Sequence, residues 1–438
     1  MSETKRKKLT GEIKISEDKF KEVALKVKTS LDVAKALKER LLDKDTTGAI
    51  GFLLASAIVL DASDIHTEPE EEQVRIRFRI DGILRDVAVI EHSAYETLLS
   101  RIKLMAGLKL NVSDRPQDGR FTVEAKSPME IRASSLPSEH GETIVLRILN
   151  PQNLITLKDL GLRDRLLTLF KKEIKSPNGM ILVTGPTGSG KTTTLYSFLQ
   201  EIQRPEIKVI TIEDPIEYHI KGISQTQVQS DKGYDFATGL RAIVRQDPDV
   251  ILVGEMRDLE TVEIALQAAL TGHLVFSTLH TNDAAGTITR LISLGAKTAN
   301  IAPALNLAIA QRLVRKVCKK SAGKRAATAE ELKEIKEALK ALSAKERPKI
   351  GDSVDVPVAK GCSECNDTGY KGRAGLFEAI VVDDELRELI LKSPSTTAVQ
   401  ALAEKKGMIP MRTDGLLRIV EGITTFEELN RVTEEESE

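Results

Sequence analysis

The stretch Gly185-Pro-Thr-Gly-Ser-Gly-Lys-Thr192 decides the fold of this 438-residue chain. It fits the pattern G-x-x-x-x-G-K-[ST], in which the backbone N–H groups of a glycine-rich loop surround phosphate groups. The apolar run 179–184 before it is typical of a buried strand, and residues 192–202 after it have the periodicity of a helix. Strand, loop and helix in this order predict a nucleoside triphosphate site, a context that a chance glycine-rich turn would lack.

Each position of this loop has its own expected role. Gly185, Gly188 and Gly190 allow the backbone to curl around the phosphates. Lys191 is expected to reach the β and γ phosphate oxygens, and the hydroxyl of Thr192 to bind Mg²⁺. The residues predicted to contact the nucleotide are Gly185, Pro186, Thr187, Gly188, Ser189, Gly190, Lys191, Thr192 and Thr193. The expected ligands are therefore ATP or GTP with Mg²⁺.

The composition argues against several kinds of protein. The 64 Lys and Arg residues nearly balance 65 Asp and Glu residues, and aromatic residues make up only 3%, so we expect no direct binding of nucleic acid. Residues 1–9 are charged and precede no apolar segment, so no signal peptide is predicted. The apolar run 50–60 falls short of the roughly 20 residues that span a bilayer. Three cysteines make no disulfide framework, and we expect a soluble, cytoplasmic protein.

The patterns along the chain predict an α/β protein built of several segments. Val74-Arg-Ile-Arg-Phe-Arg-Ile80 alternates like a half-buried strand with its arginines on the wet face, and Asp81-Gly82 turns it into a hairpin. Later apolar strands alternate with helices, which predicts a mainly parallel sheet with its ligand at the carboxyl edge. The expected segments are a helical N-terminal segment (1–47), a smaller α/β domain (48–152), the nucleotide-binding core (153–317), a cysteine-containing insertion (318–375) with a solvent-exposed helix at 326–346, and a helical C-terminal subdomain (376–438).

Acidic residues follow two of the predicted strands of the core. The strand beginning at Val250 runs into Gly254-Glu255, so Gly254 stands where a metal-binding Asp is common and Glu255 is the candidate for polarising the attacking water. The strand beginning at Lys208 runs into Ile212-Glu-Asp-Pro-Ile-Glu217, whose Glu213, Asp214 and Glu217 are candidates for the water shell of the metal or for a second base. The alternative for such residues is helix capping, which we expect of Asp258.

Histidine and arginine residues complete the candidate site. His280 ends the predicted strand 274–279 and His273 precedes it; each could sense the γ-phosphate or be a hydrogen-bonded core residue. Arg241 and Arg245 lie four apart on a helix that Pro248 terminates. They could reach the phosphates of a neighbouring subunit or pair with surface carboxylates, and their spacing does not decide between the two.

Several motifs together resemble the type II secretion and type IV pilus assembly ATPases, the GspE/PilB-like traffic ATPases. They are residues 62–69, 116–120, 185–192, 213–217, 240–249 and 271–283, and the resemblance extends from about residue 48 to the C-terminus. It implies a homo-hexameric ring of RecA-like P-loop ATPase domains, each preceded by a smaller, PAS-like α/β domain. It also implies site roles for Glu255 (the Walker B glutamate), Glu213 and Glu217 (the Asp box), His273 and His280 (the His box), and Arg120, Arg132, Arg241 and Arg245 (arginines that reach the phosphates).

The resemblance extends to a zinc motif that is incomplete here. Relatives of the assembly branch carry two Cys-x-x-Cys pairs; this chain has Cys362 and Cys365, but Cys318 is followed by Ser321 at the other ligand position. Serine is a poor zinc ligand, so Zn²⁺ is possible but doubtful.

The function implied is a motor that hydrolyses ATP to drive assembly of a pilus or pseudopilus. It would act on the cytoplasmic face of the inner membrane, peripheral to it, through a platform protein of the pilus or secretion machine. A nucleotide-gated scaffold with little turnover is the alternative outside the enzymes, and a pilus-retraction motor or a DNA-transfer ATPase is the alternative among them.

Overall fold

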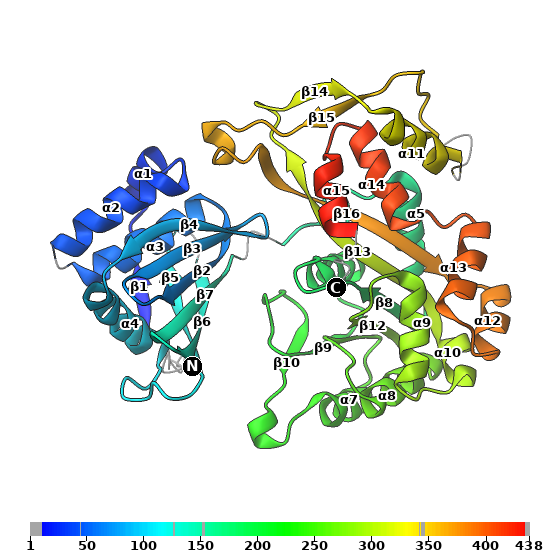
Figure 1. Ribbon diagram of the computed structural model, residues 1–438. Coiled ribbons are helices and arrows are strands. Elements are labelled where there is room, and N and C mark those ends of the chain that lie inside the picture. Colours follow the sequence, from blue (N-terminus) through cyan, green and yellow to red (C-terminus); the bar gives the residue numbers. More distant parts are fainter. Residues whose placement is uncertain are drawn as a thin grey trace. The chain divides into compact units, whose positions relative to one another are not determined.

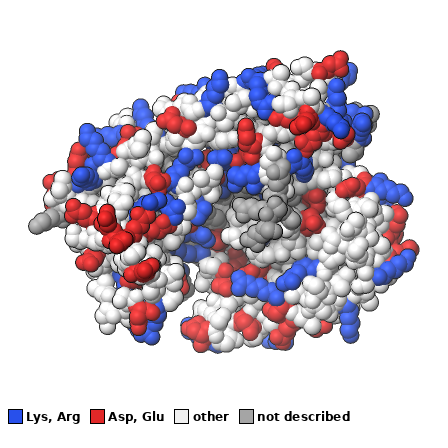
Figure 2. Space-filling model, viewed as in Figure 1, with Lys and Arg blue, Asp and Glu red and all other residues white. Residues whose placement is uncertain are grey.

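The computed structural model describes residues 11–43, 45–125, 128–150, 154–340, 342 and 347–433. The chain divides into two compact units: Met1–Pro151 with Cys318–Ser321 and Ala359–Gly372, and Gln152–Val317 with Ala322–Val358 and Arg373–Glu438. The N-terminal residues considered for a signal peptide lie outside the described part. No helix within it is both long and apolar enough to cross a bilayer. Figure 2 shows Lys and Arg side chains interspersed with those of Asp and Glu over the face in view.

The described residues of the first unit form a seven-stranded sheet in the order β1-β5-β6-β7-β2-β3-β4, with four helices (Figure 1). The elements are β1 (Glu12–Lys14), α1 (Glu17–Lys26), α2 (Ser30–Leu42), α3 (Thr46–Val59), β2 (Ala62–Pro69), β3 (Val74–Ile80), β4 (Ile83–Ile90), α4 (His92–Ala106), β5 (Gln117–Glu124), β6 (Met129–Ser138) and β7 (Gly141–Leu149).

The strands of this sheet alternate between buried and partly exposed residues. In β3 the apolar residues are buried and the three arginines half-buried, as the alternation predicted. The turn into β4 has φ of 49° at Asp81 and 84° at Gly82, which suits a two-residue hairpin, and β3 and β4 pair antiparallel. One face of the sheet therefore packs on the core, which also contains residues of α1 to α4.

The N-terminal segment is more than the helices expected of it. β1 pairs in parallel with β5, with Ile13 opposite Val123. Ile13, Val23 and Leu37 are buried in the same core as the rest of the first unit. The prediction of a purely helical, separate segment was wrong here because β1 has a single apolar residue between two charged ones and gives no strand signal of its own.

The described residues of the second unit form a seven-stranded sheet in the order β10-β9-β11-β12-β8-β13-β16 and a two-stranded sheet of β14 and β15. Its elements are α5 (Asp164–Glu173), β8 (Gly179–Thr184), α6 (Lys191–Ile202), β9 (Val209–Glu213), β10 (Ser224–Gln227), η2 (Ser230–Lys232), α7 (Phe236–Val244), β11 (Val250–Val253), α8 (Leu259–Leu270), β12 (Leu274–Leu279), α9 (Ala284–Ser293), α10 (Thr298–Ala304), β13 (Leu305–Val317), β14 (Gly323–Ala326), α11 (Ala329–Lys340), β15 (Asp355–Val358), β16 (Tyr370–Val381), α12 (Asp384–Leu391), α13 (Thr396–Lys405), α14 (Met411–Val420) and α15 (Phe426–Thr433).

Helices cover both faces of the large sheet. Along β8, Met180 and Leu182 belong to one apolar cluster, whereas Ile181 and Val183 belong to the other. Every residue of β8, β11 and β12 is buried. The pairs joining β10, β9, β11, β12, β8 and β13 are all parallel, as the alternation of strands and helices predicted.

The C-terminal part agrees only partly with the sequence. α12 to α15 lie in the segment 376–438 expected to be helical, but that segment begins with residues 376–381 of β16, which are strand. The predicted solvent-exposed helix is α11, and it buries Ile335 and Leu339 against the core because these residues share one face four positions apart.

Candidate active site

The phosphate loop joins β8 to α6 in a conformation that requires glycine. Gly185 has φ of 144°, and a Cβ there would lie 2.4 Å from the carbonyl oxygen of Gln311. Gly188 and Gly190 have φ of 80° and 90°, and Gly190 is the N-cap of α6, which begins at Lys191. The loop therefore ends at a helix N-terminus, where backbone N–H groups and the helix dipole favour an anion.

The polar groups of the loop fit a phosphate ligand. Nζ of Lys191 donates to the carbonyl oxygens of Gly185 (2.8 Å) and Pro186 (3.0 Å). Burial lowers the pKa of Lys191 from 10.5 to about 8, although Glu255 opposes this shift. The buried hydroxyl of Ser189 has no hydrogen-bond partner among the described residues. A half-buried cation and a buried hydroxyl without a partner among the described residues are groups that phosphate oxygens would satisfy.

Glu255 lies at the same edge, directly after β11 and Gly254. Its Oε1 is 2.5 Å from Nη2 of Arg257, and its Oε2 is 3.5 Å from Nε2 of His280, which follows β12. The side chain of Glu255 is 13% exposed, so the carboxylate borders the site without being sealed from water. Glu255, His280 and the phosphate loop therefore follow three neighbouring strands, β11, β12 and β8.

Gly254 is explained by close packing of two strands. Its N–H donates to the carbonyl oxygen of Ile212 (2.8 Å). A Cβ at this position would lie 3.3 Å from Cα of Glu213 and 3.3 Å from the carbonyl oxygen of Ile212. An Asp there would press on the backbone of β9, so the acidic function falls to the next residue, Glu255.

Glu213 is buried in a hydrogen-bonded network at the end of β9. Its carboxylate accepts bonds from the hydroxyls of Tyr196 and Thr211 (2.5 Å for the latter) and from Nε2 of Gln225 (3.1 Å). Burial raises the pKa of Glu213, and these hydrogen bonds oppose the rise. Glu217 lies four residues further along the chain, half-buried, and adds to that rise. The structure thus ties Glu213 to α6, the helix of the phosphate loop.

Sequence analysis missed the residues that β13 brings to the loop. β13 pairs with β8, so that Ala310 lies opposite Thr184 and Gln311 follows beside Gly185. The buried amide of Gln311 accepts a bond from Thr194 of α6 (2.7 Å). Arg312 is close enough to lower the pKa of Lys191. Only the order of the strands reveals these neighbours, because no local motif marks them.

Other predicted residues lie away from the phosphate loop. Arg241 contacts Glu260 of α8, the surface pairing that the sequence left open. Arg245 is exposed and is the C-cap of α7, which ends at Val244 and not at Pro248. His273 precedes β12, at the end opposite His280, and its Nδ1 lies 3.0 Å from the carbonyl oxygen of Ala268. Contacts of these three residues with nucleotide stay predictions.

Arg120 and Arg132 form a cross-strand pair in the first unit. They lie opposite each other in the register of β5 and β6. Glu130 lies between them, 3.5 Å from Nη1 of Arg120 and 3.2 Å from Nε of Arg132. The side chain of Arg120 is 59% exposed. Two guanidinium groups on one face can grip one anion, and their contact with nucleotide likewise stays a prediction.

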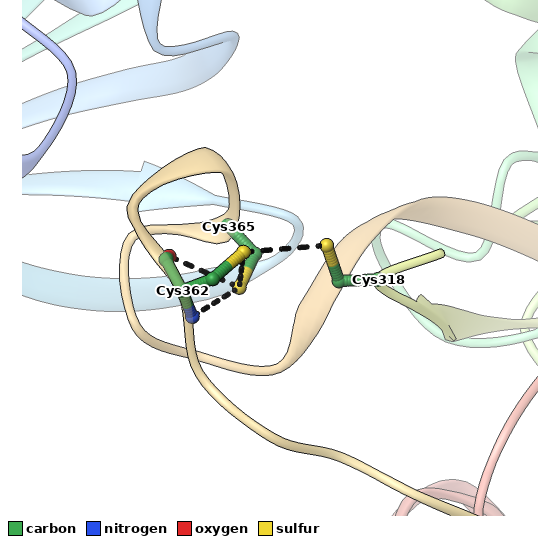
Figure 3. A group of neighbouring side chains, drawn as sticks. All are labelled: Cys318, Cys362 and Cys365. Atoms are coloured by element: carbon green, nitrogen blue, oxygen red, sulfur yellow. Dashed lines mark hydrogen bonds between the residues drawn. The ribbon is translucent and has the colours of Figure 1, made fainter. Parts of the chain in front are cut away.

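Three thiols converge in the first unit (Figure 3). Cys318 follows β13, and Cys362 and Cys365 lie at the short turn η3 (Ser363–Cys365). Sγ of Cys362 is 3.8 Å from Sγ of Cys318 and 3.5 Å from Sγ of Cys365. The hydroxyl of Ser321 is 3.8 Å from Sγ of Cys365.

These distances fit a tetrahedral metal, whose sulfur ligands at about 2.3 Å stand roughly 3.8 Å apart. Burial alone would raise the pKa of Cys365, but the N–H groups of Cys362 and Gly369 (3.2 and 3.3 Å) help to lower it to about 7. Such a thiol deprotonates readily, as a metal ligand must. The thiols could therefore hold a metal, with Ser321 in the place of a fourth ligand.

Comparisons with known proteins show the family to which the chain belongs. Residues 44–431 match the model of the type II/IV secretion system protein family. The chain is 42% identical to the type II secretion system protein E of Xanthomonas campestris over 411 residues, which are 93% of this chain and 70% of that protein. It is 45% identical to the type II secretion system ATPase E of Vibrio cholerae (88% and 75%) and 44% identical to the type IV pilus assembly ATPase PilB of Thermus thermophilus (89% and 43%).

Solved structures share the fold. The pilus retraction motor PilT with bound ADP aligns with a TM-score of 0.57 and 29% identity, covering 88% of this chain and 96% of that one. The Legionella pneumophila ATPase DotB aligns with a TM-score of 0.63 and 23% identity, covering 87% and 94%. The resemblance noted in the sequence is confirmed, and this chain belongs to the type II/IV secretion system protein family.

Proposed function

We propose that this chain is a motor ATPase that drives assembly of a pilus or pseudopilus. The observation that carries the proposal is the placing of Lys191 and Glu255 at one edge of the large sheet, Lys191 in the loop after β8 and Glu255 after β11, with β12 between the two strands. The relatives of 42–45% identity are secretion or pilus assembly proteins, which supports a role in a machine of that kind. The retraction motor is the more distant match, at 29%.

The hydrolytic step follows from the groups at this edge. Nζ of Lys191 donates to two loop carbonyls, and phosphate oxygens would compete for it as stronger, charged acceptors. The hydroxyl of Thr192 would hold Mg²⁺, which offsets charge on the phosphates. Glu255 is placed to orient and polarise the attacking water, and His280 borders its second oxygen. Glu213 would act from the buried network rather than as a freely exposed base.

The motor step needs contacts from more than one unit. We infer that the core, residues 153–317, is RecA-like and that residues 48–152 form a PAS-like domain whose Arg120 and Arg132 reach the γ-phosphate. Loss of that phosphate would release the domain, a ligand-driven hinge movement. In a homo-hexamer, with Arg241 and Arg245 reaching the next subunit, this movement would act on a platform protein at the cytoplasmic face of the inner membrane.

Substitution of Glu255 tests the catalytic assignment. Glu255→Gln should lower kcat for ATP hydrolysis about 100-fold or more, because a positioned base contributes that much. Binding of a fluorescent ATP analogue should persist, since the phosphate loop is intact. Glu263→Gln, an exposed site on α8, is the matched control and should leave kcat unchanged. Full turnover by Glu255→Gln would contradict the assignment.

We further propose that the three thiols bind Zn²⁺ with Ser321 or water as the weak fourth ligand. Ser321→Cys should then raise zinc affinity at least about tenfold, because a thiolate replaces a hydroxyl in a tetrahedral site. Competition with a chromogenic chelator measures the affinity. Ser363→Cys, on the turn that carries Cys362 and Cys365, is the control. Equal affinity in the parent and in Ser321→Cys would mean that residue 321 does not face the metal.

A further inference from the structure

A short ion pair links Glu255 to the residue two positions along the chain. Nη2 of Arg257 lies 2.5 Å from Oε1 of Glu255. The side chain of Arg257 is 69% exposed, whereas that of Glu255 is 13% exposed. The arginine thus approaches from solvent and reaches a carboxylate that is otherwise largely enclosed.

The backbone around this pair is fixed on three sides. The N–H of Met256 donates to the carbonyl oxygen of Thr278 (3.1 Å), and the hydroxyl of Thr278 donates to the carbonyl oxygen of Gly254 (2.7 Å). Asp258 then caps α8 by accepting from the N–H of Thr261 (2.8 Å). Arg257 is therefore held between two anchored residues, Met256 and Asp258, and its side chain starts from a defined point.

The surroundings give the pair a function. Each oxygen of Glu255 has a different neighbour: Arg257 at Oε1 and His280 at Oε2. Glu255 and, more weakly, Asp214 raise the pKa of Arg257. Asp214 directly follows β9, which pairs with β11. A carboxylate that orients a water molecule must itself have a fixed orientation. A glutamate side chain rotates freely unless a partner holds its carboxylate.

We propose that Arg257 is the positioning residue of Glu255: it holds Oε1 and so directs Oε2 toward the side of the pocket where the water is activated. This inference rests on the proposed catalytic role of Glu255. Arg257 itself touches neither nucleotide nor water in this scheme. Its effect on turnover passes through Glu255 alone.

An ordinary surface ion pair makes a different prediction. An exposed pair contributes little and its loss would leave turnover unchanged. A positioning residue changes kcat more than KM, and its effect vanishes once its target is removed. Non-additivity between the two sites separates the alternatives, because residues that act through one group do not add.

The experiment measures phosphate release by the full chain with Arg257→Gln, Arg257→Lys, Glu255→Gln and the double substitution. We expect Arg257→Gln to lower kcat about fivefold to tenfold, the range for losing one charged hydrogen bond with a partly exposed partner. KM for ATP should change by less than about threefold, and Arg257→Lys should restore at least half of kcat because Nζ can bind the same oxygen. In the Glu255→Gln background, Arg257→Gln should have no further effect on kcat.

Two results overturn the inference: unchanged kcat in Arg257→Gln, or an equal loss of kcat with and without Glu255. Arg387→Gln, which breaks a comparable exposed pair with Asp384 (2.9 Å) on α12, is the control and should match the parent. Full activity of Glu255→Gln would instead contradict the proposed function, and this inference with it. An inactive Glu255→Gln beside a fully active Arg257→Gln would remove only the role of Arg257.

Discussion

The two large sheets of this chain handle charge in opposite ways. In the second unit, β8, β11 and β12 are wholly buried, and charged groups appear only where these strands end. In the first unit, β3 carries three arginines along its length at half-buried positions, and β5 and β6 carry one each, Arg120 and Arg132. A sheet covered on both faces can offer chemistry only at its edge, whereas a sheet covered on one face can offer a whole surface. The phosphate loop and Arg120 illustrate the two cases.

The two units also differ in how they stabilise a buried acid. In the first, Nζ of Lys103 lies 2.7 Å from Oε2 of Glu142, and both side chains are almost completely buried. In the second, the hydrogen bonds that Glu213 accepts come from the neutral side chains of Tyr196, Thr211 and Gln225. Removing one charge from a buried ion pair should lower the free energy of unfolding, whereas removing the charge of a buried acid bound only by neutral donors should raise it.

Breaking the buried pair should have the largest effect. Lys103 also donates to the carbonyl oxygen of Val112 (2.7 Å), so it fixes the loop that leads into β5. Lys103→Met leaves Glu142 buried without its cation and should lower the free energy of unfolding by about 3–5 kcal/mol. Denaturant unfolding measures this. Adding Glu142→Leu should recover much of the lost free energy of unfolding. An unchanged free energy of unfolding in Lys103→Met would show that the pair is not tightly coupled.

A substitution of Arg120, on the solvent-exposed face of the same sheet, should affect catalysis and not stability. If Arg120 reaches the γ-phosphate, Arg120→Gln should lower kcat about 1,000-fold or more, since arginines in this role contribute at least that much. Its thermal midpoint should stay within a few degrees of the parent. Arg75→Gln, which removes an arginine of β3 paired with Glu70 at 2.8 Å, is the matched control and should leave kcat unchanged. Equal activity in both variants would reduce Arg120 to a solvated surface residue.

The sequence predicted those parts of the site that follow directly from a single strand. The phosphate loop, Glu255 and His280 each stand next to an apolar run, so a local pattern suffices to place them at the carboxyl edge. The hairpin at Asp81 and Gly82 was equally visible because the turn and both strands are contiguous.

Neighbours that depend on strand order were not visible. Gln311 and Arg312 reach the loop only because β13 inserts beside β8, more than a hundred residues away in sequence. Burial of Glu213 depends on Tyr196 and Gln225, which come from α6 and β10. The sequence showed an acid after a strand, and packing decided whether that acid faced water or the core.

Neutralising Glu213 should have the smallest effect, with the opposite sign to Lys103→Met. Because burial raises its pKa, the folded chain binds the proton more tightly than the unfolded chain does. This contribution is complete below the unfolded pKa of about 4.3 and is lost as the pH rises through the folded pKa. A glutamine side chain cannot be deprotonated, so Glu213→Gln keeps this stability as the pH rises. The free energy of unfolding of the variant should exceed that of the parent by about 1 kcal/mol at pH 7.5 and by little or nothing at pH 4.

Unfolding measured at both pH values tests this difference between the two units. Glu201→Gln, an acid of α6 that lies 3.5 Å from Lys171 near the surface, should show no such gain at either pH. If Glu213→Gln instead destabilises the chain equally at both pH values, then its carboxylate is ionised and favourably bound in the fold. The hydroxyl of Tyr196 would then be the donor that compensates the charge, and Tyr196→Phe should reproduce the loss.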